Sequence, residues 1–167
     1  MKRFEDYTDF EGENWNGWMN GRGLPTGELK TGENGNMYWS GLLKGAPGTF
    51  YKIQPSLLKR FSFQSAEERR ALYEVYFLYR IHEREPDEAK DIAIAVCSEG
   101  GRVVGSHTNV TDETPVGQWL KGYEPGAAWF AGGAQELWIG TGGGLDSAFR
   151  KVDIDNIRVK RVTSKSE

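Results

Sequence analysis

The segment LYEVYFLYRI at residues 72–81 constrains the fold more than any other part of the sequence. Five apolar or aromatic side chains recur at every second position: Tyr73, Val75, Phe77, Tyr79 and Ile81. The other face carries Leu72, Glu74, Tyr76, Leu78 and Arg80. A period of two, rich in aromatic and β-branched residues, is typical of a strand with one buried face. The helix formers at 66–72 leave a helix through this region as the alternative.

Similar short segments recur along the whole chain. We expect strands at 4–10, 37–43, 57–63, 91–97, 102–105, 116–121, 127–131, 135–140 and 150–162. Nine or ten short strands separated by turns predict an all-β fold, a two-sheet antiparallel β-sandwich with jelly-roll topology. The 22 glycines suit many tight turns. We therefore expect one domain over 1–167, with its core at about 4–162 and a polar tail at 163–167.

The last predicted strand contains an irregularity. Val152 and Ile154 share one parity, whereas Ile157 and Val159 share the other. Strict alternation would expose one of the two pairs. A one-residue β-bulge near Asp155 would return both pairs to the core.

Composition excludes several classes of protein. The net charge is −3, and basic residues are mixed with acidic ones, so we expect no nucleic-acid partner. No apolar run follows Lys2 and Arg3, and none is long enough to span a bilayer. These features predict synthesis in a cytoplasm without a signal peptide and no membrane partner. The single cysteine, Cys97, lies in an apolar run and is expected to be buried.

Two ends of the chain together resemble a known group of folds. The opening reads DFEGENWNGW, followed by MYWSG, and the close reads VDIDNIRV. This pattern resembles galactose-binding-like jelly-roll modules, which include many carbohydrate-binding modules. The resemblance covers about residues 8–160 and implies the β-sandwich fold. Fold likeness alone does not define a ligand.

The resemblance also implies a structural calcium ion between the first and last strands. Its ligands here would be Asp9 and Glu11 near the start and Asp153 and Asp155 near the end. Calcium prefers such carboxylate and carbonyl oxygens. The alternative is that these acids face solvent or cap turns, as Asp155 could do at a bulge.

Aromatic side chains are the candidates for binding a sugar, because a sugar ring can stack its apolar face on them. Trp15 lies in an Asn-rich turn and Trp129 follows a Pro-Gly turn, so both are candidate platforms, with Tyr51 and Arg102 as weaker additions. The other four tryptophans are expected in the core: Trp18 and Trp119 from the resemblance, and Trp39 and Trp138 from their strands. The alternative for each platform is packing at a sheet end or a subunit interface.

The sequence offers little support for catalysis. The two histidines, His82 and His107, lie beside polar segments, and we expect structural or surface roles for them. No GxSxG elbow is present. A pair of carboxylates with glycosidase spacing is not visible in sequence. We therefore expect no catalytic residues.

Three functions remain, in order of preference. The first is a non-catalytic component of a particle surface, such as a bacteriophage decoration or tail protein, with other copies of itself or particle proteins as partners and a possible glycan ligand. Its location would then be a virion surface. The alternative is a carbohydrate-binding module of a secreted glycan-active system. The third is a small β-sandwich lyase or hydrolase.

Overall fold

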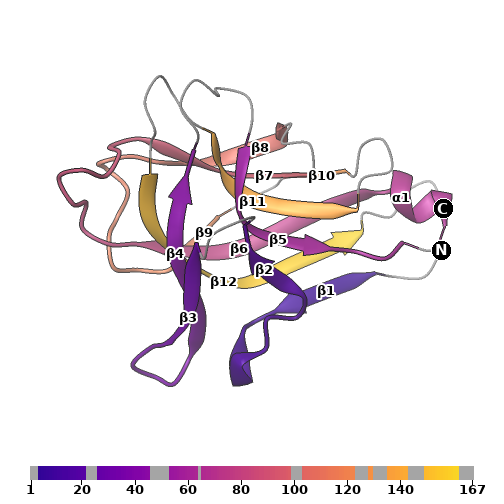
Figure 1. Ribbon diagram of the computed structural model, residues 1–167, viewed down its shortest axis with the longest axis horizontal. Coiled ribbons are helices and arrows are strands. Elements are labelled where there is room, and N and C mark those ends of the chain that lie inside the picture. Colours follow the sequence, from indigo (N-terminus) through magenta and orange to yellow (C-terminus); the bar gives the residue numbers. More distant parts are fainter. Residues whose placement is uncertain are drawn as a thin grey trace.

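The computed structural model describes residues 4–21, 26–45, 53–63, 65–98, 103–122, 128–129, 135–142 and 149–161. Two antiparallel sheets pack face to face, which confirms the predicted all-β sandwich (Figure 1). The turn at 99–101 and the tail at 163–167 lie outside the described residues.

The larger sheet has seven strands. They are β1 (Glu5–Thr8), β3 (Gly27–Thr31), β4 (Met37–Lys44), β6 (Leu72–Ile81), β9 (Leu120–Lys121), β10 (Ala128–Trp129) and β12 (Phe149–Arg161). The order is β10-β6-β12-β4-β3, with β1 also paired to β12 and β9 to β6. The first strand thus lies beside the last, as the resemblance implied.

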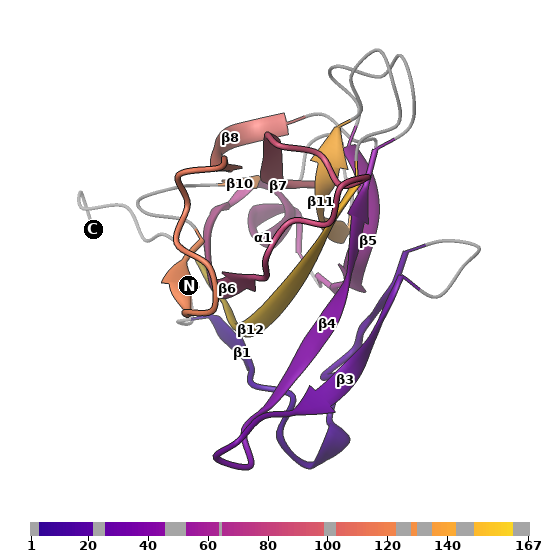
Figure 2. The same ribbon diagram turned by 90° about the vertical axis from the view of Figure 1, so that its left-hand side faces the viewer.

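The smaller sheet has five strands: β2 (Trp18–Asn20), β5 (Ile53–Arg60), β7 (Ile92–Ser98), β8 (Val103–Val110) and β11 (Glu136–Gly142). Their order is β2-β5-β11-β7-β8. Figure 2 shows β5 and β11 on one side of the molecule and the long β12 running through the middle of the view, between them and β6. A short helix, α1 (Ala66–Arg70), and a 3₁₀ turn, η1 (Glu11–Glu13), complete the fold.

The inner faces of both sheets form one apolar core, which explains the period of two. In β6 the five predicted residues are all buried: Tyr73, Val75, Phe77, Tyr79 and Ile81. The helix formers before them are used in α1, which begins after Ser65. The Ser65 hydroxyl accepts the Glu68 backbone N–H at 3.1 Å. The alternative helix therefore stops at Arg70, and the strand prediction is confirmed.

The predicted bulge is present in β12. Its register against β6 shifts between Asp155 and Arg158, and Asn156 has a φ of 48°. All four apolar residues are fully buried: Val152, Ile154, Ile157 and Val159. The extra residue therefore returns both pairs to the core, and it leaves Asp155 and Asn156 on the outer side of the sheet.

Some strand boundaries were wrong. Of the predicted strand 116–121, only Leu120–Lys121 pairs with a neighbouring strand. The strands β2 and β3 were not predicted at all. The polar segment 111–119 instead forms turns beside the sheet, because Thr111 and Thr114 bond to each other through backbone and side chain.

Burial of Cys97 is confirmed. It is fully buried, and desolvation raises the pKa of its thiol to about 12. In the described part of the chain, no helix is long and apolar enough to cross a membrane.

Candidate functional site

The outer face of the seven-stranded sheet carries a cleft. Because side chains alternate along β6, Leu78 and Arg80 point away from the core. Register places Arg80 beside Asp153 and Leu78 beside Asp155. The cleft has a volume of about 810 Å³. Its lining combines the β3–β4 turn, β6, β12 and the segment before β9: Thr31, Gly32, Glu33, Asn34, Asn36, Tyr38, Leu78, Arg80, His82, Gly117, Trp119, Asp155 and Asn156.

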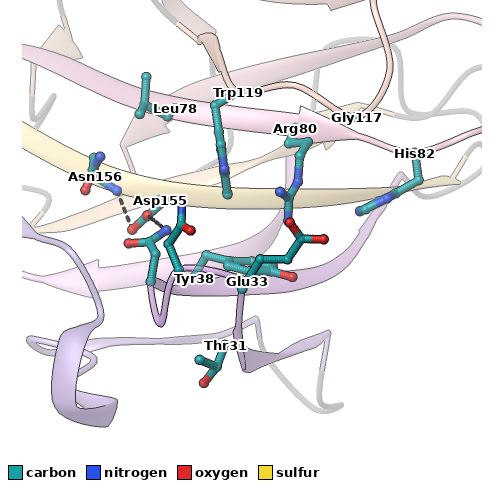
Figure 3. A pocket seen from close by; sticks show the side chains of 13 residues that line it. Thr31, Glu33, Tyr38, Leu78, Arg80, His82, Gly117, Trp119, Asp155 and Asn156 are labelled. Atoms are coloured by element: carbon teal, nitrogen blue, oxygen red, sulfur yellow. Dashed lines mark hydrogen bonds between the residues drawn. The ribbon is translucent and has the colours of Figure 1, made fainter.

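Arg80 lies at the centre of this lining (Figure 3). Its guanidinium carbon is 4.8 Å from the ring centre of Tyr38 and 4.5 Å from that of Trp119. The two rings themselves meet edge to face, with centres 5.4 Å apart. Arginine stacks on aromatic faces through its delocalised charge. The three side chains therefore hold one another in place.

Asp153 anchors the guanidinium from beneath. Its carboxylate is fully buried, and Oδ2 lies 3.0 Å from Arg80 Nε and 2.7 Å from His82 Nε2. The terminal nitrogens of Arg80 have no protein partner among the described residues. The guanidinium of Arg80 is planar and has five N–H groups. With the Nε–H bound to Asp153, the four N–H groups of its terminal nitrogens remain as donors.

Asp155 lies at the opposite end of the cleft from His82 (Figure 3). It is 2 % exposed, and it accepts hydrogen bonds from Asn36 Nδ2 at 2.9 Å and from the Asn156 backbone N–H at 2.8 Å. Burial raises the pKa of its carboxyl to about 6, with smaller increases from Glu11 and Asp9, although the two hydrogen bonds act in the opposite direction. The cleft thus has a polar floor of a carboxyl and two amides.

A second, smaller cavity continues from the cleft. It has a volume of about 300 Å³ and shares Leu78 and Asn156 with the cleft. Its remaining lining residues are Tyr7, Tyr76, Phe77, Lys121 and Arg158. The Tyr7 hydroxyl donates to Asn156 Oδ1 at 2.9 Å, which fixes the amide at the boundary between the two cavities.

The four predicted calcium ligands have other partners in the structure, although Asp9 and Glu11 lie near enough to Asp155 to affect its pKa. Asp153 Oδ2 bonds to Arg80 and His82, whereas its Oδ1 is buried and has no hydrogen-bond partner among the described residues. Glu11 Oε1 accepts the Met37 backbone N–H at 2.8 Å. Asp9 Oδ1 accepts the Glu11 N–H at 3.1 Å. Among the described residues, no three His, Cys, Asp or Glu side chains form a group that could hold a metal ion. The residues therefore do not fit the implied ion as a set, and calcium binding stays a prediction.

The structure separates the predicted sugar platform from the cleft. Trp15 is half-buried and packs edge to face on Phe10, with ring centres 6.0 Å apart, and it lines neither cavity. Trp129 pairs through its backbone in β10, and its side chain lies outside the described parts. Tyr51 and Arg102 also lie outside the described residues.

The expectation for Trp119 was wrong. Trp18 and Trp39 are core residues, 3 % and 0 % exposed, but Trp119 is half-buried and lines the cleft. Trp138 is also half-buried, on the outer face of the other sheet, where its indole N–H donates to Glu136. The backbone pairing of β9 begins only after Trp119. The direction of the Trp119 side chain is therefore not set by the in-and-out alternation of a paired strand.

A signal for the cleft was present in the sequence. The outer face of 72–81 carries Tyr76, Leu78 and Arg80, a mixed aromatic, apolar and cationic set that is not typical of a solvated face. The sequence does not indicate which residues of β4, β12 and the segment before β9 complete the cleft. Only the order of the strands in the sheet places them next to this face of β6.

Comparison with known sequences finds no relative. No protein-family model matches the chain. No curated protein matches it either.

Comparison with solved structures identifies the fold. The xylan-binding CBM22-1 module of Xyn10C from Paenibacillus barcinonensis is similar with a TM-score of 0.55 and 13 % identity, over 95 % of this chain and 94 % of that one. The mannan-recognising module TmCBM27 has a TM-score of 0.57 and 18 % identity, over 98 % and 100 %. The CBM22-1-GH10 part of Clostridium thermocellum Xyn10B, solved with xylohexaose, has a TM-score of 0.56 and 16 % identity, over 96 % and 29 %. Carbohydrate-binding modules therefore share the architecture of this chain: it has a carbohydrate-binding-module-like β-sandwich fold.

Proposed function

We propose that the chain is a non-catalytic carbohydrate-binding module that holds a polysaccharide in the cleft over its seven-stranded sheet. One observation carries the proposal: Trp119 and Tyr38 clamp an arginine whose terminal nitrogens point to no protein partner in the described part of the chain. Aromatic faces suit the apolar face of a sugar ring, and a fixed guanidinium suits its hydroxyls.

The polar floor of the cleft supports the same ligand class. Asp155, Asn36 and Asn156 offer acceptors and donors within a few residues of the aromatic pair. A neutral, hydroxyl-rich ligand can pair with such a floor without bringing a buried charge of its own. The cleft volume, about 810 Å³, is within the range of small-molecule and oligosaccharide-sized sites.

Xylan and mannan are the first ligands to test, because the similar modules are described as recognising them. Affinity electrophoresis in gels containing either polysaccharide should retard the wild-type protein. Trp119→Ala should abolish the retardation, since it removes the stacking face and releases Arg80. Trp15→Ala should leave the retardation intact if the cleft, and not the earlier sequence-based platform, is the site.

Trp138→Ala is the matched control, because it removes a half-buried indole of the same size from the opposite sheet. Circular dichroism should show that all three variants remain folded. Equal retardation of wild type and folded Trp119→Ala would refute the proposed site.

A role as a particle-surface component has no observation in its favour among the described residues. The alternative of a carbohydrate-binding module is the better supported of the two leading functions, since the similar structures are modules of that kind.

A further inference from the structure

We propose that the second cavity binds the carboxylate of a uronic acid on the same glycan chain, so that the ligand is an acidic polysaccharide. This inference rests on the proposed function and adds the class of ligand. Three features of the molecule support it: the continuity of the two cavities, the contacts of Arg158, and the charges that line each cavity.

The two cavities form one track along β6. Tyr76 lines the second cavity, Leu78 lines both, and Arg80 lines the cleft. These residues alternate along the strand and face the same side. At about 3.4 Å per residue, the track from Tyr76 to Arg80 spans roughly 14 Å. One extended glycan chain can therefore occupy both cavities at once.

Arg158 in the second cavity is positioned by an ion pair and a ring contact, whereas Arg80 in the cleft also has a hydrogen bond to its Nε. Register places it between Tyr7 on β1 and Tyr76 on β6. Its Nε lies 3.3 Å from Glu5 Oε1, and its guanidinium carbon is 5.2 Å from the ring centre of Tyr7. Its terminal nitrogens have no protein partner in the described ranges. Arg158 is thus held less tightly than Arg80, and its terminal nitrogens form a fork of donors that faces the cavity.

The two cavities differ in their charge. The cleft is lined by the acids Glu33 and Asp155 as well as by Arg80. The lining of the second cavity contains Lys121 and Arg158 and, among the described residues, no acid. Acids also act on the second cavity from outside its lining, because Glu5 lies 3.3 Å from Arg158 Nε. Burial raises the pKa of the Tyr7 hydroxyl, and Asp9, Asp155 and Glu11 add to that rise. Since the cleft has acids in its own lining, an anionic group is disfavoured less in the second cavity than in the cleft.

A carboxylate matches the donors that the second cavity offers. The guanidinium of Arg158 can bond both carboxylate oxygens in parallel, and Lys121 adds a second positive charge. Asn156 Oδ1 is occupied by the Tyr7 hydroxyl, so the donors of its amide remain on the cavity wall. A uronic acid unit carries such a carboxylate at C6, on a sugar ring that otherwise resembles the neutral sugar units of the same polysaccharide.

The test compares acidic and neutral forms of the same polymer by isothermal titration calorimetry. One pair is glucuronoxylan and its carboxyl-reduced form. The other is mannan and mannan oxidised at C6 to the uronate. For whichever backbone binds, the acidic form should bind roughly two- to fivefold more tightly, the size of effect that one partly exposed ion pair gives. The preference should shrink between about 0.01 M and about 0.15 M salt, because screening increases.

Variants separate this inference from the proposed function. Lys121→Gln together with Arg158→Gln should bring the ratio of the affinities for the acidic and neutral forms of the same polymer to about one. Lys121→Gln alone should reduce the preference, which keeps the test valid if the double variant is unstable. The matched control is Lys44→Gln with Lys151→Gln, since both lysines are exposed and line neither cavity.

Two negative results have different meanings. Equal affinity of the wild type for the acidic and neutral forms would overturn the uronate inference and leave the proposed function standing. Absence of binding to all four polymers would overturn both.

Discussion

Replacing Asp155 by asparagine should stabilise the protein at high pH and have little effect at low pH. Burial raises the pKa of the Asp155 carboxyl from its ordinary 3.8 to about 6 in the folded state. Between these two values the folded protein binds more protons than the unfolded chain. The free energy of unfolding therefore rises as the pH falls through 6 and levels off below 3.8.

The magnitude follows from the same rise. One pKa unit corresponds to about 1.4 kcal/mol, so the ionised Asp155 costs the folded state about 3 kcal/mol above pH 7. Asn at this position has no charge to desolvate, and Asn36 can rotate its amide to keep the hydrogen bond. We expect Asp155→Asn to raise the free energy of unfolding by about 2 to 3 kcal/mol at pH 8, and the melting temperature by roughly 5–10 °C.

The assay is thermal unfolding of both proteins at about pH 4.5, 6 and 8, which lie below, at and above the folded-state pKa of about 6. EDTA in every buffer removes any metal that could neutralise the carboxylate. Asp87→Asn, at an exposed position, is the control and should change stability equally at every pH. The reasoning is refuted if the difference in melting temperature between Asp155→Asn and wild type does not shrink toward pH 4.5. It is also refuted if Asp155→Asn is less stable than wild type at pH 8.

Three further predictions concern the core and the implied ion. Gly41→Ala should lower the free energy of unfolding by about 2 kcal/mol or more, because the new methyl group would overlap the ring of Trp39 and a backbone carbonyl; Gly32→Ala, which meets only ordinary contacts, is the control in chemical denaturation. Cys97 should not react with iodoacetamide in the native protein and should react once urea unfolds it, since its thiol is buried with a pKa of about 12; rapid native labelling would contradict its burial. If the chain binds calcium, adding Ca²⁺ should raise the melting temperature and EDTA should reverse the rise; an unchanged melting temperature in both would discard that prediction.

The sequence by itself determined the fold class. Alternation in 72–81 placed five residues in the core, and the parity change in 152–159 located the bulge. Both signals are local, because a strand with one buried face must repeat every two residues wherever it lies in the sheet. The burial of Cys97 came from the same kind of local pattern.

Only the tertiary structure decided the candidate site. Tyr38, Arg80, Trp119 and Asp155 come from four separate segments, and the sheet order together with the turns of 111–119 brings them to one cleft. Sequence spacing predicts which side of a strand a residue faces, but not which strand lies beside it. The resemblance placed Trp119 in the core, whereas the two-residue length of β9 leaves it outside the ladder and over Arg80. The same reason explains Arg158: nothing in its own strand indicates that Tyr7 and Lys121 lie within reach of it.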